Sequence, residues 1–310
     1  MDAAVSNLPA DVDKALQEKA RAWLALSLTP GLGPTRVRRL VEYFGGAAAV
    51  LRASLTELES TGILASSAQS LGTGKSAELA QEELARAAGI GVRVVTLDDS
   101  DYPNELKQIY HPPPVLYVRG EVSTISQPGI AVVGTRHPTP YGTGMAERLA
   151  CDLAARGLTI ISGMARGVDT AGHRGAIAGK GKTVAVFGTG IDVIYPKENT
   201  RLSEQILALS GALISEFPIG TFPAPQNFPI RNRIISGMSV GVLVSKQPST
   251  AALVLRPAAP WNRIVMSLQC PATSPTRIPG GRTRSSSRVP SWLRRGRMFG
   301  KNCRHRCGLP

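Results

Sequence analysis

The hydrophobic and polar positions of this chain follow one period before residue 90 and another after residue 128. Between residues 11 and 90, apolar residues recur every three or four positions among Ala, Leu, Glu and Arg, as in amphipathic helices. From residue 128 to 245, short apolar runs alternate with glycine-rich turns and helical periods, which indicates parallel strands joined by crossover helices. We therefore predict an α/β fold: a Rossmann-like, mostly parallel sheet with helices on both faces, preceded by a small all-helical domain.

The expected elements divide the chain into four regions. The strands of the sheet are expected at 130–133, 159–161, 183–187, 212–215 and 240–244, and its helices at 141–156, 168–178, 198–209 and 229–238. Two earlier strands, 92–96 and 115–119, are separated by repeated prolines, which exclude regular structure between them. The predicted regions are a helix-hairpin-helix or SAM-like domain at 1–90, a connecting segment packed on the sheet at 91–127, an incomplete Rossmann-like domain at 128–245 and a tail at 246–310.

Glycine and cationic residues come together in the turns that follow the expected strands. The carboxyl ends of parallel strands share one edge of a sheet, where backbone N–H groups and helix N-termini can meet an anion. The turns therefore predict a site for a phosphate-bearing ligand, and the alternative is a set of tight turns with surface arginines. The residues expected at this edge are Gly134, Thr135, Arg136, Ser162, Gly163, Arg166, His173 and Lys197.

A fourth turn combines an aromatic residue with two arginines. Phe228 is followed at short spacing by Arg231 and Arg233. A ring that stacks on bases, beside cations that meet the backbone, is what single-stranded nucleic acid requires. The alternative is a core phenylalanine at a capped helix start.

The Pro30-Gly-Leu-Gly-Pro34 segment joins two helical patterns and resembles a helix-hairpin-helix. The N–H groups of such a turn can bind a DNA phosphate, helped by Arg36, Arg38 and Arg39. The alternative is a hairpin that only packs, with solvated arginines.

Other chemistry-bearing residues form weaker patterns. His173 has no evident nucleophile and orienting carboxylate beside it, so we expect a structural or phosphate-facing side chain rather than a catalytic base. Asp169 and Asp192 are expected to cap helices or fix turns. The 72–76 segment imitates a phosphate-binding loop without its first glycine or preceding strand, and the cysteines of 303–307 are too close for a zinc site. We therefore predict no metal, no cofactor and no catalysis.

The strong positive charge belongs to the end of the chain. The sequence has 36 Lys and Arg against 22 Asp and Glu, a net charge of +14. Of these, 13 basic and no acidic residues lie at 246–310, which leaves 23 basic and 22 acidic residues before Lys246. The same region before Lys246 contains a single cysteine, Cys151, as expected in a reducing compartment. With no signal-peptide pattern and no apolar run of about 20 residues, we expect a cytoplasmic protein without membrane contact.

Taken together, these segments resemble the DprA/Smf family of DNA-processing proteins of natural transformation. The resemblance covers roughly residues 20–245, with many short motifs in the same order. The matching segments are 30–34, 102–103, 113–120, 133–136, 162–169, 188–190, 195–196, 215–218 and 227–237.

The resemblance implies a Rossmann-like domain at 128–245 that binds single-stranded DNA, with Arg136 in a phosphate pocket and Phe228 as the stacking face. It implies no catalysis. Such proteins protect incoming strands and help load the RecA recombinase. Family members often have Ser where Thr135 stands, and they continue beyond Ser245 with more sheet, a homodimer surface and often a winged helix, which this sequence does not show.

Two other classes of function remain open. A nucleotide-processing enzyme, such as a nucleoside-monophosphate phosphoribohydrolase, could use the same sheet edge, but it would show a Pro-Gly-Gly-rich loop with a catalytic Arg and Glu, and no such run is evident. A purely structural helical-hairpin adaptor would leave the Arg136 edge unexplained.

Residues from about Lys246 onward are predicted to be a frameshifted translation of the family's C-terminal region. When the third base of each codon is read with the first two bases of the next, residues 266–274 can encode VFAVPGNV, a run typical of the family, and Trp261-Asn262 can encode only Glu. The ordered sheet should then end at Val244, and the tail should be disordered.

Overall fold

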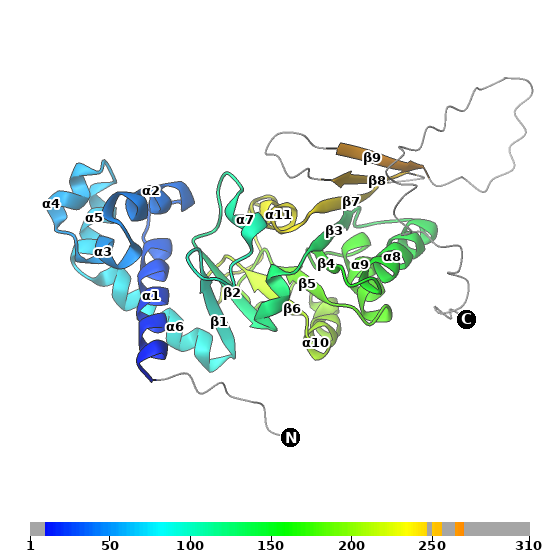
Figure 1. The fold of residues 1–310 in the computed structure, drawn as a ribbon, viewed down its shortest axis with the longest axis horizontal. Helices are drawn as coiled ribbons and strands as arrows, with labels where there is room; N and C mark the ends of the chain where they lie inside the picture. Colours follow the sequence, from blue (N-terminus) through cyan, green and yellow to red (C-terminus); the bar gives the residue numbers. More distant parts are fainter. Residues whose placement is uncertain (1–9, 247–249, 256–263, 270–310) are drawn as a thin grey trace, which may run out of the picture. The chain divides into compact units, whose positions relative to one another are not determined.

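The computed structural model describes residues 10–246, 250–255 and 264–269 (Figure 1). Its first part contains only helices, as the helical period predicts. Their bounds are α1 Ala10–Leu28, α2 Pro34–Phe44, α3 Ala47–Arg52, α4 Leu55–Ser60, α5 Ala65–Gly72 and α6 Lys75–Gly89.

Local sequence signals set the helix boundaries in this part. α2 begins at Pro34, whose missing N–H suits a first turn, and its C-cap is Gly45 with φ 77°. Ser54 and Glu57 form a capping box at the start of α4. Trp23 of α1 is only 2% exposed, in the core that these helices share with the first strands of the sheet.

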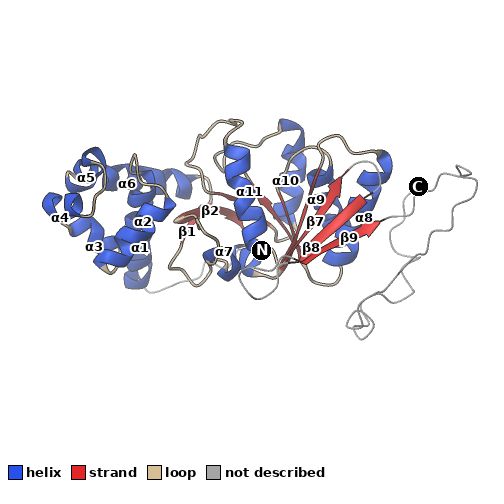
Figure 2. Cartoon of the chain, turned by 90° about the horizontal axis from the view of Figure 1, so that it is seen from above, coloured by secondary structure: helices blue, strands red, loops and turns tan. Residues whose placement is uncertain are grey.

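A nine-stranded sheet follows in the order β1-β2-β6-β5-β4-β3-β7-β8-β9 (Figure 2). The central strands β6, β5, β4, β3 and β7 are parallel, and two antiparallel strands flank them on each side. The strand bounds are β1 Val92–Thr96, β2 Val115–Gly120, β3 Gly129–Gly134, β4 Thr159–Ser162, β5 Thr183–Val186, β6 Ala212–Ser215, β7 Gly241–Lys246, β8 Thr250–Leu255 and β9 Ile264–Gln269.

Helices cover both faces of the sheet (Figure 1). α8, α9 and α10 lie on one face, where Ile130, Val132 and Ile160 pack against α8 and α9. α7 and α11 lie on the other face, where Ala131 and Ile161 pack against α11. The helix bounds are α7 Asn104–Lys107, α8 Pro140–Ala154, α9 Val168–Ala178, α10 Thr200–Ala208 and α11 Asn227–Met238, with 3₁₀ turns at η1 Val122–Ser126 and η2 Lys197–Asn199. The predicted α/β class with a mostly parallel sheet is confirmed.

The strand order reverses at β3, since β4, β5 and β6 extend the sheet on one side of β3 and β7 lies on its other side. Ligands of open α/β sheets bind beyond the carboxyl ends of the strands at such a reversal. The Gly134-Thr135-Arg136 turn directly follows β3 and therefore lies at this point.

The two strands expected within the connecting segment 91–127 are present as β1 and β2, and they extend the sheet from β6. One expectation about the sheet needs correction. The sheet does not end at Val244, since β7 runs to Lys246 and β8 and β9 pair beyond it. The physical reason is that β7 leaves an unpaired edge, and the apolar segment 250–255 follows closely enough to add an antiparallel strand. The rest of the 246–310 tail lies outside the described residues.

Direct contacts join the helical part to the sheet. Trp23 Nε1 donates to Asp98 at 2.9 Å, and Lys19 Nζ lies 2.8 Å from the Asp99 carboxylate. Over the described ranges, no helix is long and apolar enough to span a membrane.

Candidate nucleic-acid interface

Three side chains from separate segments meet at the carboxyl edge of the sheet. The Arg136 guanidinium lies 5.7 Å from the centre of the Phe228 ring, within the range of a cation–π contact. The Tyr195 ring lies 5.7 Å from the Phe228 ring, tilted by 36°. Arg136 and Tyr195 are exposed and Phe228 is half-buried, so this aromatic–arginine cluster presents both a positive charge and ring surface to solvent.

The position of Phe228 depends on the turn after β5. A Cβ atom added at Gly188 would lie 2.8 Å from the Phe228 ring, so the ring rests on the bare backbone of this glycine. Asn227, the residue before Phe228, is 9% exposed at the start of α11. The glycine that the sequence places after β5 thus serves as a seat for the aromatic ring rather than as a direct phosphate contact.

A buried charge pair lies beneath the cluster. Arg231 is 4% exposed and donates to the Val186 carbonyl, and its guanidinium packs against Gly163. Burial lowers the pKa of Arg231 to about 10, Asp169 opposes this change, and the charge of Arg136 adds to it. Burial raises the pKa of Asp169, although Arg231 and two backbone N–H groups act in the opposite direction. The pair orders the turns after β4 and β5 through the hydrogen bonds of Asp169 with Gly163 N–H and of Arg231 with the Val186 carbonyl.

The next two cations along the edge, Arg166 and Lys197, differ in whether a carboxylate pairs with them. Arg166 pairs with Glu198 through two contacts of 2.7 and 2.8 Å, and this exposed pair raises the pKa of Arg166. Lys197 is exposed beside Glu198 at the start of η2. Among the residues that the structure describes, neither Arg136 nor Lys197 has a carboxylate within ion-pair distance. Both are therefore available to phosphates.

Arg233 lies in a more enclosed place, paired with Glu216. The side chains are 24% and 10% exposed, and Glu216 Oε1 and Arg233 Nη1 have no hydrogen-bond partner among the described residues. Burial raises the pKa of Glu216 to about 6, against the lowering effect of Arg233. This arginine contacts DNA only if the pair opens.

Ser162, Gly163, His173 and Arg231, which the sequence places at the predicted DNA-binding edge, are all buried. Ser162 Oγ donates to the Val132 carbonyl at 2.6 Å, and Gly163 N–H donates to Asp169 at 3.1 Å. His173 is fully buried with Nδ1 2.8 Å from Thr183 Oγ1. These residues shape the edge from within.

The helix N-termini at this edge are largely satisfied within the protein. Thr139 caps α8 by accepting from Gly142 N–H at 3.1 Å, and Val168 N–H at the start of α9 donates to the Thr135 carbonyl at 3.2 Å. At α8 and α9, these contacts leave fewer free N–H groups for an anion than the sequence suggests.

The Pro30–Pro34 hairpin packs within the helical part. Ser67 Oγ donates to the Pro30 carbonyl at 2.6 Å, and a Cβ atom at Gly31 would lie 2.8 Å from Leu64. Arg36 donates to the Gly31 carbonyl at 2.9 Å, and Arg38 pairs with Glu42. These contacts favour the packing hairpin, and DNA contact by this turn stays a prediction.

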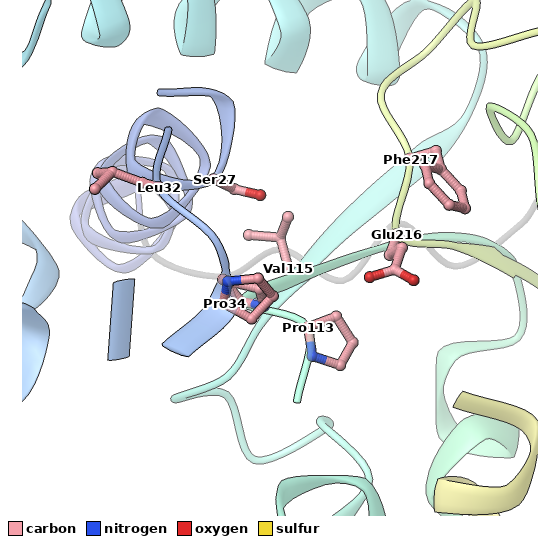
Figure 3. A pocket seen from close by; sticks show the side chains of 8 residues that line it. Ser27, Leu32, Pro34, Pro113, Val115, Glu216 and Phe217 are labelled. Carbon is pink, nitrogen blue, oxygen red and sulfur yellow. The ribbon is translucent and has the colours of Figure 1, made fainter. Parts of the chain in front are cut away.

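A small cavity of about 130 Å³ lies between the hairpin and the sheet. Figure 3 shows Leu32 and Pro34 from the helical part, Val115 from β2, and Glu216 and Phe217 from the segment after β6 around it. Its lining is mostly apolar, with the Glu216 carboxylate as the charged group. It is far smaller than the cavities of several hundred Å³ that hold nucleotide-sized ligands.

Tyr195 is the residue of the cluster that the sequence did not single out as a site residue. The signal was present, because Tyr195 lies two positions before Lys197 in a turn after a buried strand. Over the described ranges, no three His, Cys, Asp or Glu side chains gather as a metal site would require.

A basic and aromatic edge on a mostly parallel sheet defines a Rossmann-like ligand-binding protein, and comparison with known proteins narrows the class. The family model described as DNA recombination-mediator protein A matches residues 93–283. The chain belongs to this family, the DprA/Smf DNA-processing proteins, as its motifs predict.

Individual relatives support the same family assignment, both by sequence and by fold. Protein Smf of Synechocystis is 38% identical over 260 residues, covering 79% of this chain and 63% of that protein. A putative DNA processing protein DprA of Mycobacterium tuberculosis is 31% identical over 270 residues, covering 82% and 68%. The crystal structure of DprA from Streptococcus pneumoniae superposes with a TM-score of 0.59 at 28% identity, covering 75% and 76%. The chain spans about half to two thirds of the length of most curated relatives that it matches.

Proposed function

We propose that this chain binds single-stranded DNA along the carboxyl edge of its sheet and acts by binding rather than by catalysis. The observation that carries the proposal is the aromatic–arginine cluster, in which Arg136 lies over the Phe228 ring and Tyr195 lies beside it. Bases of any sequence can stack on such rings, while the cation meets the backbone. Membership in a DNA-processing family supports the proposal.

Protection of incoming strands and loading of RecA belong to the same proposal, because they require a protein that coats single strands without reading their sequence. The homodimer of the family is a further proposal for this chain. The competing function is an enzyme that uses a nucleotide at the same edge.

The test is an equilibrium titration of the full chain with a fluorescent oligothymidylate, with AMP and NAD as competitors. We expect Arg136→Ala to weaken binding by at least about 10-fold, since an ionic hydrogen bond contributes about 1.5–3 kcal/mol. Affinity should also fall as salt rises, because bound phosphates release counterions. Arg156→Ala is the matched control, because Arg156 is exposed just before β4 and so at the opposite edge. Equal affinities of the Arg136 and Arg156 variants, or displacement of DNA by AMP at low concentration, would refute the proposal.

A further inference from the structure

A second aromatic side chain is exposed on the loop between β6 and α11. Phe222 is 80% exposed, whereas Phe228 is half-buried. A single exposed apolar side chain is ordinary on a protein surface. What distinguishes Phe222 is how firmly the backbone beside it is anchored and where that anchor lies.

Three hydrogen bonds, one to α6 and two to the turn after β5, fix the loop just before Phe222. Ile219 N–H donates to Glu83 Oε1 of α6 at 2.7 Å, and Gly220 N–H donates to Asp192 Oδ1 at 2.8 Å. The Thr221 carbonyl accepts from Gly190 N–H at 2.9 Å. Prolines at 218, 223 and 225 further restrict the backbone around this point.

The anchor lies beside the aromatic–arginine cluster. Gly190 bonds to Thr221, the neighbour of Phe222, while Gly188 seats Phe228 two residues earlier in the same turn. Phe222 and Phe228 are six positions apart, so their backbones are at most about 22 Å apart. Both phenylalanines therefore neighbour the turn after β5, and their separation is within the length of a few nucleotides.

The chemistry around Phe222 suits a base more than a phosphate. Two carboxylates, those of Glu83 and Asp192, accept hydrogen bonds from this anchor, and a carboxylate repels a phosphate. A phenyl ring on a restrained loop loses little conformational freedom when a flat aromatic group stacks on it. Stacking is tolerant of sequence, because every base has a π-face.

We propose that Phe222 is a second stacking position, which meets another base of the same single strand that Phe228 and Arg136 bind. The inference rests on the proposed function, and it adds that the site extends past the turn after β5 onto the β6–α11 loop. Short oligonucleotides should meet only the aromatic–arginine cluster, and longer ones should also reach Phe222.

The test compares the affinities of oligothymidylates of increasing length for the full wild-type chain and its Phe222→Ala, Phe222→Trp and Phe228→Ala variants. We expect Phe222→Ala to weaken binding of the longer oligonucleotides at least about 5-fold and to leave the shortest unchanged. Phe222→Trp should retain wild-type affinity. Tyr43→Ala is the matched control, since Tyr43 is 71% exposed at the far end of α2, and it should bind as wild type does.

The outcomes separate this inference from the function on which it rests. If Phe222→Ala binds every length as wild type does while Phe228→Ala binds weakly, the second stacking position is wrong and the proposed function stands. If Phe228→Ala also binds as wild type does, both are wrong. A loss of self-association in Phe222→Ala, seen by sedimentation with unchanged DNA affinity, would assign the ring to a protein contact and overturn the inference.

Discussion

His173 shows how one buried residue links the fold to pH. Its side chain is fully buried on α9, with Nδ1 bonded to Thr183 and Nε2 without a partner among the described residues. Burial lowers the pKa of His173 to about 3, and the charge of Arg231 adds to the effect. The imidazole is therefore neutral in the folded protein, which is the structural alternative that the sequence left open.

We predict that His173 makes the fold less stable in mild acid. An unfolded histidine binds a proton near pH 6.5, whereas the folded one does not until about pH 3. The contribution of the neutral His173 to the free energy of unfolding is thus fully present above pH 6.5. Below pH 6.5, the free energy of unfolding falls by about 1.4 kcal/mol for each pH unit. Glu216 has the opposite effect, since its raised pKa favours the folded state at lower pH.

The measurement is the free energy of unfolding by urea between pH 7 and pH 5, for wild type and His173→Asn. The comparison isolates the histidine, because Glu216 is common to both proteins, and the variant should show a flatter dependence on pH. If the variant does not fold, NMR titration of wild-type His173 replaces it. Equal slopes, or a His173 that titrates near pH 6.5 in the folded protein, would contradict the account.

The sequence predicts whether a side chain is exposed or buried where its place after a strand or along a helix decides this. Arg136 follows a buried strand and a glycine, and it is exposed as expected. Arg231 lies three and four positions before the buried Ile234 and Ile235, so a check of helical period would have placed it on the inner face. The partner of Arg233 could not be found in this way, because Glu216 comes from another element.

At the scale of elements, α6 reaches the candidate interface through one carboxylate. Glu83 is buried and accepts from Tyr117 Oη of β2 at 3.0 Å and from Ile219 N–H at 2.7 Å. It also pairs with Arg86 one turn later in α6. The helical part thus fixes both the flank of the sheet and the loop that carries Phe222.

We predict that Glu83→Ala lowers the free energy of unfolding by about 2–4 kcal/mol, because it leaves the buried Tyr117 hydroxyl and Ile219 N–H without an acceptor. It should also weaken DNA binding, since the loop loses one of its three anchors. Glu82→Ala is the control, because its side chain is exposed on the same helix. The measurements are urea unfolding and oligothymidylate affinity, and a Glu83 variant as stable as the Glu82 variant would show that the contact contributes nothing.

The parallel elements were predictable from alternation alone, and their bounds agree within a few residues. The two strands before the parallel core were also predicted, at 92–96 and 115–119, but their pairing was not. β1 pairs with β2, and β2 joins the sheet by pairing with β6. Strand pairing across about 100 residues leaves no local signal in the sequence.

At the scale of the whole molecule, the abrupt change in charge after Ser245 is explained by the proposed frameshift. The family match runs to residue 283, past the proposed shift, so the decisive comparison is at the nucleotide level. We predict that one inserted or deleted base near codon 245 restores an acidic, family-like C-terminal sequence. Resequencing the gene is the measurement, and a region that yields no such sequence in either other frame would refute the frameshift.

The central claim is that single-stranded DNA binds at the carboxyl edge of the sheet. Ultraviolet cross-linking of the full chain to an oligothymidylate, followed by mass-spectrometric mapping of the peptides, tests it most directly. We predict cross-links at Phe228 and Tyr195 that Arg136→Ala diminishes and Arg156→Ala does not. Cross-links confined to the helical part or to residues 246–310, with none at these two aromatics, would contradict the account.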